Sequence, residues 1–211
     1  MEKRNWDGNR LWESGGLYGS SSLREVDPGS GEVRHKVDVP EKYFAEGLAQ
    51  VGDRLIQLTW KEGKALVYKV PSLEKIAEHD YQGEGWGLCY DGKRLVMSDG
   101  SDRLTFRDPQ TFAPTGEVHV RLAGTPVERL NELECVDGVV YANVWLEDTI
   151  YRIDPRTADV TAVIDASGLL TAEERPQAEV LNGMAWDPAK KTFLITGKRW
   201  PEMFEAVFVP E

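Results

Sequence analysis

The sequence predicts an all-β protein, a five-bladed β-propeller with four-stranded antiparallel blades. Three observations lead to this fold class: one hairpin motif recurs along the chain, a second alternates with it, and long helical patterns are nearly absent. The repeats return at a spacing of roughly 40 to 50 residues, which is typical of propeller blades. Four-stranded units repeated around an axis form a propeller, whereas a β-sandwich would not require one motif to return on this period.

The first motif is an extended run followed by an Asp-Pro or Pro-Ser turn. Proline fixes φ, aspartate caps the turn, and β-branched or aromatic residues alternate on either side, so each copy predicts two antiparallel strands. The copies are LREVDPGSGEV (23–33), LVYKVPSLEKI (66–76), LTFRDPQTFAP (104–114), IYRIDPRTADV (150–160) and the partial FEAVFVP (204–210).

The second motif is a hairpin punctuated by Asp-Gly, Gly-Asp or Asp-Pro. Its copies are NWDGNRLWESGG (5–16), EGLAQVGDRLIQLTW (46–60), WGLCYDGKRLVMSDG (86–100), NELECVDGVVYANVW (131–145) and NGMAWDPAKKTFLITGK (182–198). The only helix-like piece, TAEERPQAEV (171–180), reads as a short turn or loop. We therefore expect one propeller domain over residues 1–211. Its terminal blades should be incomplete, because the last repeat stops at Pro210-Glu211 and the first begins where its inner strand should already be under way.

Composition limits the partners. Charged residues make up 29% of the chain and the net charge is -11, which argues against nucleic acid and against an anionic membrane surface. The chain has no apolar run of about 18 residues, and MEKRNWDGNRLW lacks the apolar core of a signal peptide. We expect a monomer, and the compartment stays open.

The cysteines and histidines offer little chemistry. Cys89 and Cys135 both lie in apolar strand segments, so we expect two buried small side chains. A disulfide would need adjacent Cβ atoms, which a sequence cannot show. The three histidines are scattered without zinc spacing. Neither a nucleophile elbow nor a phosphate-binding Gly-Lys motif is present, and we expect no metal and no cofactor.

Polar and aromatic residues recur where the inner hairpins begin and end. The active and binding sites of propellers lie around the central channel, so a ring of such residues predicts a pocket there. The residues entering the motif are Glu46, Trp86, Asn131 and Asn182, and those leaving it include Glu13, Trp60, Asp99, Trp145 and Lys198.

Each of these residues also has an ordinary structural interpretation. Glu46 could be a solvated turn carboxylate, although its apolar neighbours predict desolvation and a raised pKa, as a general acid/base needs. Asn131 and Asn182 could be turn formers, and Lys198 could lie on the surface. Tryptophan is most often a core residue, which we expect for Trp6, Trp12 and Trp186 but not for the recurring set at the channel.

The motifs resemble the glutamine cyclotransferase family of plant and bacterial type. The similar strings are ESGGLYGSSSLREVD, FAEGL, QLTW, GEGWGL, SDGSDRL, LNELE, ANVW, VLNGMAWD and TGKRWP, which together run from about residue 11 to 204. The resemblance implies a five-bladed propeller without a catalytic metal. It implies cyclisation of the N-terminal glutamine of peptides or proteins to pyroglutamate, with release of ammonia. By position, Glu46 matches the proton-transfer residue, and Asn131 and Lys198 match the remaining polar site residues. The pocket aromatics match Phe44, Trp60, Trp86 and Trp145, and Asn182 joins them through its place in the ring.

One segment departs from the family pattern. The family begins with a phenylalanine-threonine-glutamine-glycine-leucine segment that supplies an inner strand and a substrate-contacting glutamine, whereas MEKRN does not match it. Counting back from Leu11 against Leu55 places the slot equivalent to Glu46 on position 2. We therefore expect the first inner strand to be missing or altered. Ala45 and Gly15 are smaller departures.

Two other functions compete with this one. A metal-dependent propeller lactonase or esterase could use Glu46, Asn131, Asn182 and Asp99 around a channel ion, although indoles are poor partners for a hard cation. A non-catalytic propeller would bind the peptide without turnover.

Overall fold

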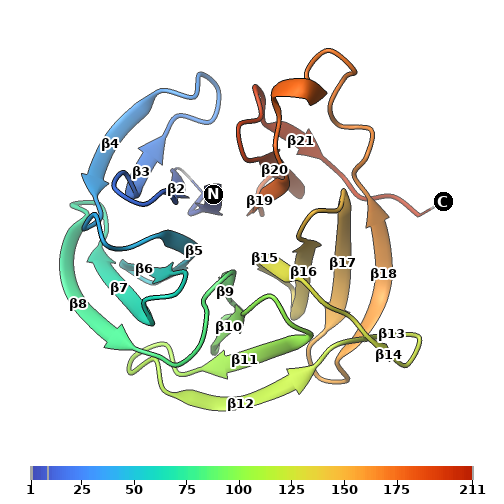
Figure 1. Cartoon of the computed structure of the whole chain (residues 1–211), viewed down its shortest axis with the longest axis horizontal. Helices are drawn as coiled ribbons and strands as arrows, with labels where there is room; N and C mark the ends of the chain where they lie inside the picture. Colours follow the sequence, from blue (N-terminus) through green and yellow to red (C-terminus); the bar gives the residue numbers. More distant parts are fainter. Residues whose placement is uncertain (1, 9, 211) are drawn as a thin grey trace.

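Five antiparallel sheets surround a central channel (Figure 1). The computed structural model describes residues 2–8 and 10–210 of the chain. The sheets follow one another around the ring in sequence order, and each contributes its first strand to the channel side (Figure 1). The expectation of a five-bladed propeller is confirmed.

The first three blades each contain four strands in sequence order. Blade 1 contains β1 (Glu2–Trp6), β2 (Leu11–Gly15), β3 (Ser22–Val26) and β4 (Val33–Asp38). Blade 2 contains β5 (Ala45–Val51), β6 (Arg54–Thr59), β7 (Lys64–Lys69) and β8 (Glu74–Asp80). Blade 3 contains β9 (Leu88–Tyr90), β10 (Leu95–Ser98), β11 (Arg103–Arg107) and β12 (Pro114–His119).

The last two blades are less regular. Blade 4 contains β15 (Leu130–Val136), β16 (Val139–Val144), β17 (Thr149–Asp154) and β18 (Asp159–Asp165). A small hairpin of β13 (Arg121–Leu122) and β14 (Thr125–Pro126) extends its outer edge. Blade 5 contains β19 (Leu181–Asp187), β20 (Thr192–Gly197) and β21 (Phe204–Ala206), three strands within the described residues, as expected for an incomplete blade. The helix-like segment forms a short 3₁₀ turn, η1 (Arg175–Gln177).

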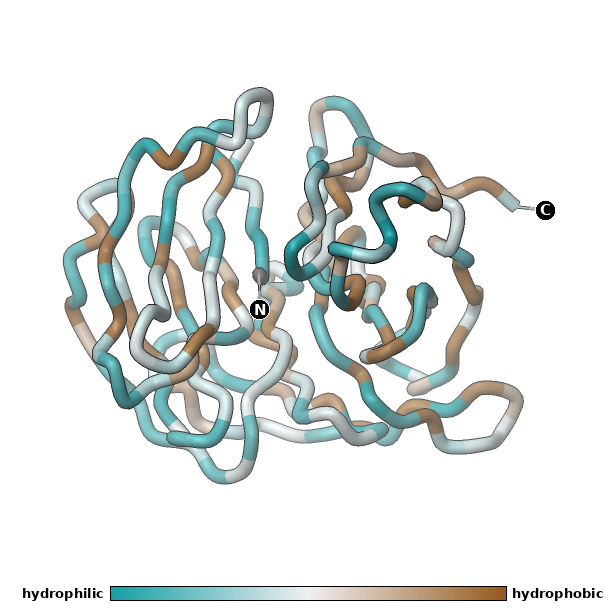
Figure 2. The backbone as a smooth tube through the Cα atoms, turned by 45° about the horizontal axis from the view of Figure 1, so that its top comes forward, coloured by the Kyte–Doolittle hydropathy of each residue, from teal (hydrophilic) through white to brown (hydrophobic). Residues whose placement is uncertain are grey.

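The first inner strand is present with an altered sequence. Strand β1 pairs with β2 along its whole length, from Glu2 opposite Gly15 to Trp6 opposite Leu11. The alternative that this strand is missing is therefore wrong, and the unmatched residues form it. Strand β1 lies beside the channel, whereas the C-terminal segment runs along the outer rim (Figures 1 and 2).

Apolar side chains hold adjacent blades together. The indole of Trp12 in blade 1 is fully buried among residues of blade 2 that include Leu48, Leu55 and Leu66. Inner strands are buried on both faces, while the outermost strands, such as β8, are mostly exposed. This burial gradient orients every blade with its first strand inward. No helix among the described residues has the length and apolarity to cross a membrane.

A disulfide joins blades 3 and 4. Cys89 on β9 and Cys135 on β15 are bonded, with their Cα atoms 5.5 Å apart. The expectation of two separate buried thiols is therefore wrong, because the ring places two strands side by side that are 46 residues apart in sequence.

Removing this disulfide should destabilise the ring. The bond closes a loop of 46 residues, and the loss of chain entropy in the unfolded state is then worth up to about 4 kcal/mol. We expect the Cys89→Ala/Cys135→Ala double variant to unfold at clearly lower urea concentration than the oxidised protein. Reductant should shift the midpoint of the parent protein and leave that of the double variant unchanged; equal midpoints of parent and variant would contradict the prediction.

Candidate active site

An extra residue in three inner strands turns one side chain of each toward the channel. In β5, Ala45 pairs with Thr59 and Leu48 pairs with Gln57, so Glu46 and its neighbour face a single residue of β6. The same irregularity follows Leu130 in β15 and Leu181 in β19. Such bulges re-aim side chains beside functional sites. They explain why the equivalent residues of these blades converge.

Two glycines allow the inner strands to approach closely. The backbone N–H of Gly47 donates to the carbonyl oxygen of Trp86 at 2.8 Å. A Cβ on Gly47 would lie 2.7 Å from the carbonyl carbon of Gly87, and one on Gly87 would lie 2.0 Å from the carbonyl oxygen of Asn131. Blades 2, 3 and 4 can therefore meet at one end of the channel only because these positions lack side chains.

Polar side chains on the second strands fix the backbone of the inner strand in the next blade. Each donates a hydrogen bond to a carbonyl oxygen at or beside a predicted site residue, and each is buried. The bonds run from Ser14 Oγ to Glu46 O at 2.6 Å, from Ser98 Oγ to Asn131 O at 2.6 Å and from Asn143 Nδ2 to Leu181 O at 2.7 Å. The sequence analysis did not identify these supporting residues.

Six of the eight predicted site residues line one cavity of about 320 Å³ at this end of the channel. The volume falls in the range of small-molecule sites. The complete lining comprises Phe44, Glu46, Trp60, Trp86, Trp145, Leu146, Glu179, Val180 and Lys198. The ring of Phe44 meets Trp60 edge-on at 5.6 Å, and that of Trp86 meets Trp145 edge-on at 5.5 Å. The cavity therefore has aromatic walls and a single deeply buried carboxyl group.

The other two predicted residues, Asn131 and Asn182, lie fully buried behind Glu46 around Lys3. The ammonium of Lys3 donates to Asn131 Oδ1 at 2.5 Å and to Asn182 Oδ1 at 2.7 Å. It also lies 3.6 Å from Glu46 Oε2 and 3.4 Å from Glu132 Oε2, distances of ion pairs rather than of hydrogen bonds. Lys3 is itself fully buried, so it supplies the positive charge that the buried carboxyl groups need.

Strand β1 brings Lys3 to this position because its register has no bulge. Counting along the repeat indicated position 2 as the equivalent of Glu46. At the bulge, β5 has two residues, Glu46 and Gly47, where β1 has one. Lys3, opposite Ser14, therefore occupies the channel position that corresponds to Glu46. The count was wrong by one residue, and Lys3 was missed for that reason.

Glu132 is a second buried acid that the sequence analysis missed. It follows Asn131 as Gly47 follows Glu46, so a carboxylate occupies a position that is glycine in blade 2. Its Oε1 accepts a hydrogen bond from the backbone N–H of Arg4 at 3.2 Å. A glutamate in a glycine position was the available signal in the sequence.

Burial raises the pKa of both acids. Desolvation raises the pKa of Glu46 to about 7, although the nearby charge of Lys3 lowers it in part. Desolvation likewise raises the pKa of Glu132 to about 8, again against the lowering effect of Lys3. Glu46 can therefore exchange a proton near neutral pH.

The structure decides among the ordinary interpretations of the site residues. Glu46 is only 2% exposed, so it is not a solvated turn residue. Asn131 and Asn182 lie within β15 and β19 and are not turn formers. Lys198 is half-buried at the cavity edge, where its ammonium lies 2.7 Å from a carboxylate oxygen of Glu179.

The expected core tryptophans pack away from the cavity. Trp12 is completely buried, and Trp6 and Trp186 are partly buried against core clusters.

Two residues at the ends of the inner hairpins lie outside the cavity. Asp99 accepts hydrogen bonds from Ser101 and Arg103 within blade 3. Glu13 forms ion pairs with Arg4 and Arg24. These partners explain both carboxylates structurally.

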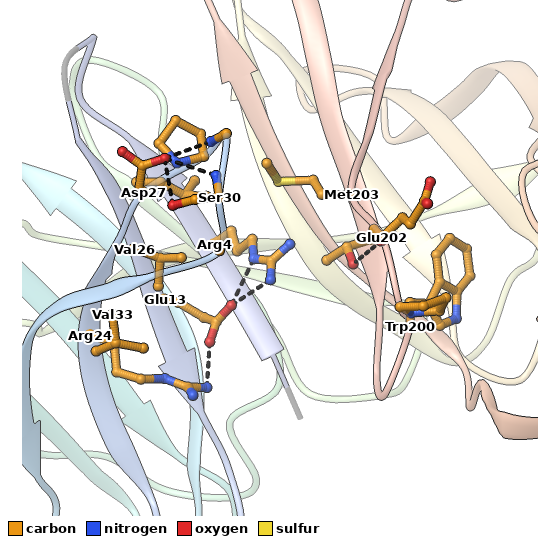
Figure 3. A pocket seen from close by; sticks show the side chains of 16 residues that line it. Arg4, Glu13, Arg24, Val26, Asp27, Ser30, Val33, Trp200, Glu202 and Met203 are labelled. Atoms are coloured by element: carbon orange, nitrogen blue, oxygen red, sulfur yellow. Dashed lines mark hydrogen bonds and ion pairs between the residues drawn. The ribbon is translucent and has the colours of Figure 1, made fainter.

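Glu13 belongs to a larger cleft of about 500 Å³ between blades 1 and 5 (Figure 3). Figure 3 shows Arg4 and Arg24 pointing at Glu13 on the blade 1 side, with Met203 across the cleft on the blade 5 side. The cleft is polar, and its Arg4 and Arg24 side chains are already paired with Glu13. The cavity of aromatic walls is the better candidate for a reaction site.

The geometry also bears on a channel metal. Among residues 2–8 and 10–210, no three histidine, cysteine or acidic side chains are grouped to hold an ion. The oxygens of Glu46, Glu132, Asn131 and Asn182 instead surround the Lys3 ammonium. Asp99, the fourth member of the lactonase hypothesis, binds Arg103 elsewhere.

Comparison with known proteins agrees with the fold and the motifs. The family model described as glutamine cyclotransferase matches residues 4–208. A glutaminyl-peptide cyclotransferase of Arabidopsis thaliana is 41% identical over 200 residues, which cover 92% of this chain and 62% of the relative. The chain thus spans less than two thirds of that relative's length.

Solved structures extend the comparison. The crystal structure of Myxococcus xanthus glutaminyl cyclase superposes with a TM-score of 0.87 at 40% identity, covering 97% of this chain and 88% of that one. Kuenenia stuttgartiensis hydrazine synthase, with a TM-score of 0.57 and 16% identity over 92% of this chain and 55% of that one, shares the fold alone. The resemblance carried by the sequence motifs is confirmed, and the chain belongs to the glutamine cyclotransferase family.

Proposed function

We propose that this protein is a glutaminyl-peptide cyclotransferase, which converts the N-terminal glutamine of a peptide or protein to pyroglutamate and releases ammonia. The observation that carries the proposal is the place of Glu46, a buried carboxyl with a pKa near 7 in a cavity with aromatic walls. Family membership supports the same reaction. We further propose that the chain acts as a monomer and without a metal.

The cavity suits an intramolecular reaction. The α-amine must attack the side-chain amide of the same residue, so the reactants are already tethered and the protein has to supply the curled conformation. Holding reacting groups in near-attack geometry can remove several kcal/mol from a barrier, roughly 7 to 11 in the best cases. Phe44, Trp60, Trp86 and Trp145 provide apolar walls for the folded-back side chain and exclude water.

Glu46 would move one proton during the reaction. The neutral amine attacks the amide carbon and forms the new C–N bond, and the ionised Glu46 takes a proton from the attacking nitrogen. The carboxyl then gives this proton to the leaving nitrogen as the old C–N bond breaks, so ammonia departs and Glu46 is again ionised. A carboxyl that acts first as base and then as acid works best with a pKa near the working pH.

Lys198 would stabilise the negative charge that develops on the amide oxygen. Lys198 lines the cavity and supplies a cation at its edge. Asn131 and Asn182 are fully buried behind Glu46 and accept hydrogen bonds from Lys3. They would contribute indirectly, by holding the Lys3 ammonium beside the Glu46 carboxylate.

Mass spectrometry of a short peptide with N-terminal glutamine tests the function directly. We expect loss of one ammonia from the peptide at a rate far above spontaneous cyclisation, and the same rate in the presence of a chelator. A peptide blocked at its α-amine is the matched control and should remain unchanged. Folded protein that does not exceed the spontaneous rate would refute the proposal, and inhibition of the cyclisation by chelator would refute the part of it that excludes a metal.

A further inference from the structure

One carboxylate oxygen holds the indoles of two blades. Trp60 Nε1 donates to Glu84 Oε2 at 2.8 Å, and Trp86 Nε1 donates to the same oxygen at 2.9 Å. Trp60 directly follows β6 of blade 2, and Trp86 precedes β9 of blade 3. Glu84 lies in the segment between these two blades, so a single side chain ties together walls that belong to different blades.

These two bonds join the aromatic contacts around the cavity. On the blade 2 side, Tyr18 meets Phe44 edge-on at 5.2 Å and Phe44 meets Trp60 at 5.6 Å. On the blade 3 side, Trp86 meets Trp145 at 5.5 Å. The Glu84 carboxylate lies between the two groups and bonds the terminal indole of each.

Glu84 acts from outside the cavity. It lines a separate hollow of about 260 Å³ together with residues such as Met97 and Asp99. Lys61 lies next to it, with its ammonium 4.0 Å from the centroid of the Trp60 ring and 3.9 Å from Glu84 Oε1. Hydrogen bonds to a carboxylate acceptor are stronger than those between neutral groups.

The orientation of the indoles has a chemical consequence. Because both N–H groups point to Glu84, the indoles present their carbon atoms to the cavity. An apolar lining around Glu46 excludes water and maintains the desolvation that raises its pKa. A rotated indole would widen the cavity and admit a polar group or water.

We propose that Glu84 is a positioning residue that fixes Trp60 and Trp86 across the boundary between blades 2 and 3 and so sets the shape of the substrate cavity. The inference rests on the proposed function, which supplies the substrate. Glu84 itself touches no reacting atom, and its effect passes through the two indoles.

Three variants test this role. Glu84→Ala removes the acceptor, and we expect kcat/KM for a Gln-peptide to fall by about 10- to 100-fold, because a small misplacement of positioning groups costs this much. Glu84→Gln retains an oxygen that can accept both N–H bonds and should stay within about 3-fold of the parent. Glu117→Ala removes a half-exposed carboxylate that lines the same hollow but contacts neither indole nitrogen. Glu117 lies 3.7 Å from Arg103 and 3.8 Å from His119, and its removal should leave activity unchanged.

The pH profile separates positioning from general stability. Burial is the largest cause of the raised pKa of Glu46. Among the side chains, the charge of Lys3 lowers this pKa and that of Glu84 raises it, and Glu132 is a further buried acid beside Lys3. In Glu84→Gln only the charge is lost, so the acidic limb should move little. In Glu84→Ala water also enters the cavity and reduces the desolvation of Glu46, so the acidic limb of the kcat/KM profile should move clearly to lower pH. A merely structural residue would lower activity at all pH values without moving the limb.

Tryptophan emission and near-ultraviolet circular dichroism give a readout that needs no turnover. Both should change in Glu84→Ala and stay near the parent spectrum in Glu84→Gln. Equal activity and spectra of Glu84→Ala and Glu117→Ala would overturn the inference, as would equal losses in the alanine and glutamine variants. If the parent does not cyclise any Gln-peptide, the proposed function and the role of Glu84 in catalysis both fall, while the spectra still decide whether Glu84 fixes the indoles.

Discussion

Replacing Glu46 with glutamine is expected to lower kcat by about 10²- to 10⁴-fold, the usual contribution of a positioned general acid/base. Glutamine is close to isosteric with the 2% exposed glutamate, so the fold and the cavity should persist. The loss would therefore report the proton transfer. Steady-state kinetics on a Gln-peptide, with circular dichroism to check the fold, measure it.

The pH dependence of kcat/KM in the same variant tests whether Glu46 is the carboxyl group that must be ionised. In the parent protein, kcat/KM should require ionised Glu46, with a pKa of about 7, and a neutral substrate amine, with a pKa of about 7.7 to 8.0. Below both values log(kcat/KM) should rise with pH at a slope of about two, and in Glu46→Gln at a slope of about one. An unchanged slope, or full activity of the variant, would contradict the role of Glu46.

Replacing Lys3 with methionine is expected to destabilise the protein at high pH and to move the acidic limb of its activity upward. Lys3 lowers the raised pKa values of Glu46 and Glu132, so without it both acids stay protonated to higher pH. A carboxyl with a raised pKa in the folded state binds protons more tightly there than in the unfolded chain. Stability therefore falls as pH rises from the ordinary value, near 4.5, through the folded value.

The cost of losing Lys3 should thus depend on pH. Near pH 5 both acids are neutral, so the variant should lose only the hydrogen bonds from Lys3 to Asn131 and Asn182, about 1 to 3 kcal/mol for a buried acceptor left unsatisfied. Well above pH 8 their ionisation would leave buried charges without a partner, and breaking a buried ion pair costs about 3 to 5 kcal/mol. Urea unfolding at the two extremes measures the difference.

Two further variants serve as controls. Lys3→Gln retains a donor for Asn131 and Asn182 without the charge, and it should show the same upward movement of the limb with a smaller loss of stability. Lys36→Met removes an exposed lysine that pairs with Asp38, and it should show neither effect. A deficit of Lys3→Met that is equal at low and high pH would refute the electrostatic explanation.

Local chemistry made most of the fold predictable. The Asp-Pro turns could be recognised because aspartate bonds the turn backbone directly. Asp27 Oδ1, for example, accepts from the N–H groups of Gly29 and Ser30 at 2.9 Å. Once the repeats were aligned on such turns, equivalent positions could be compared between blades, and the cavity residues Glu46, Trp60 and Trp86 followed from that comparison.

The residues that escaped prediction depend on relations between blades. Lys3 reaches the channel because β1 has no bulge where β5 has one, and a bulge leaves no clear mark in the sequence. Glu84 bonds indoles from two blades, and the Cys89–Cys135 bond joins two more. Register and the packing of one blade on the next decide these contacts, so alignment of the repeats could not show them.

The Lys3 cluster makes closure of the ring and assembly of the site a single event. Within the described residues, blades 1 and 5 share no sheet, and they meet along β1 and β19, where Lys3 bonds Asn182. Local opening at such a seam costs less than global unfolding, and native-state hydrogen exchange detects it. Each opening would separate Lys3 on β1 from Asn182 on β19 and so take apart the cluster around the ammonium. A ligand that binds only the closed ring lowers the population of the open ring. Amide exchange in β1 should therefore slow as substrate fills the cavity, so substrate binding stabilises the first strand of the chain.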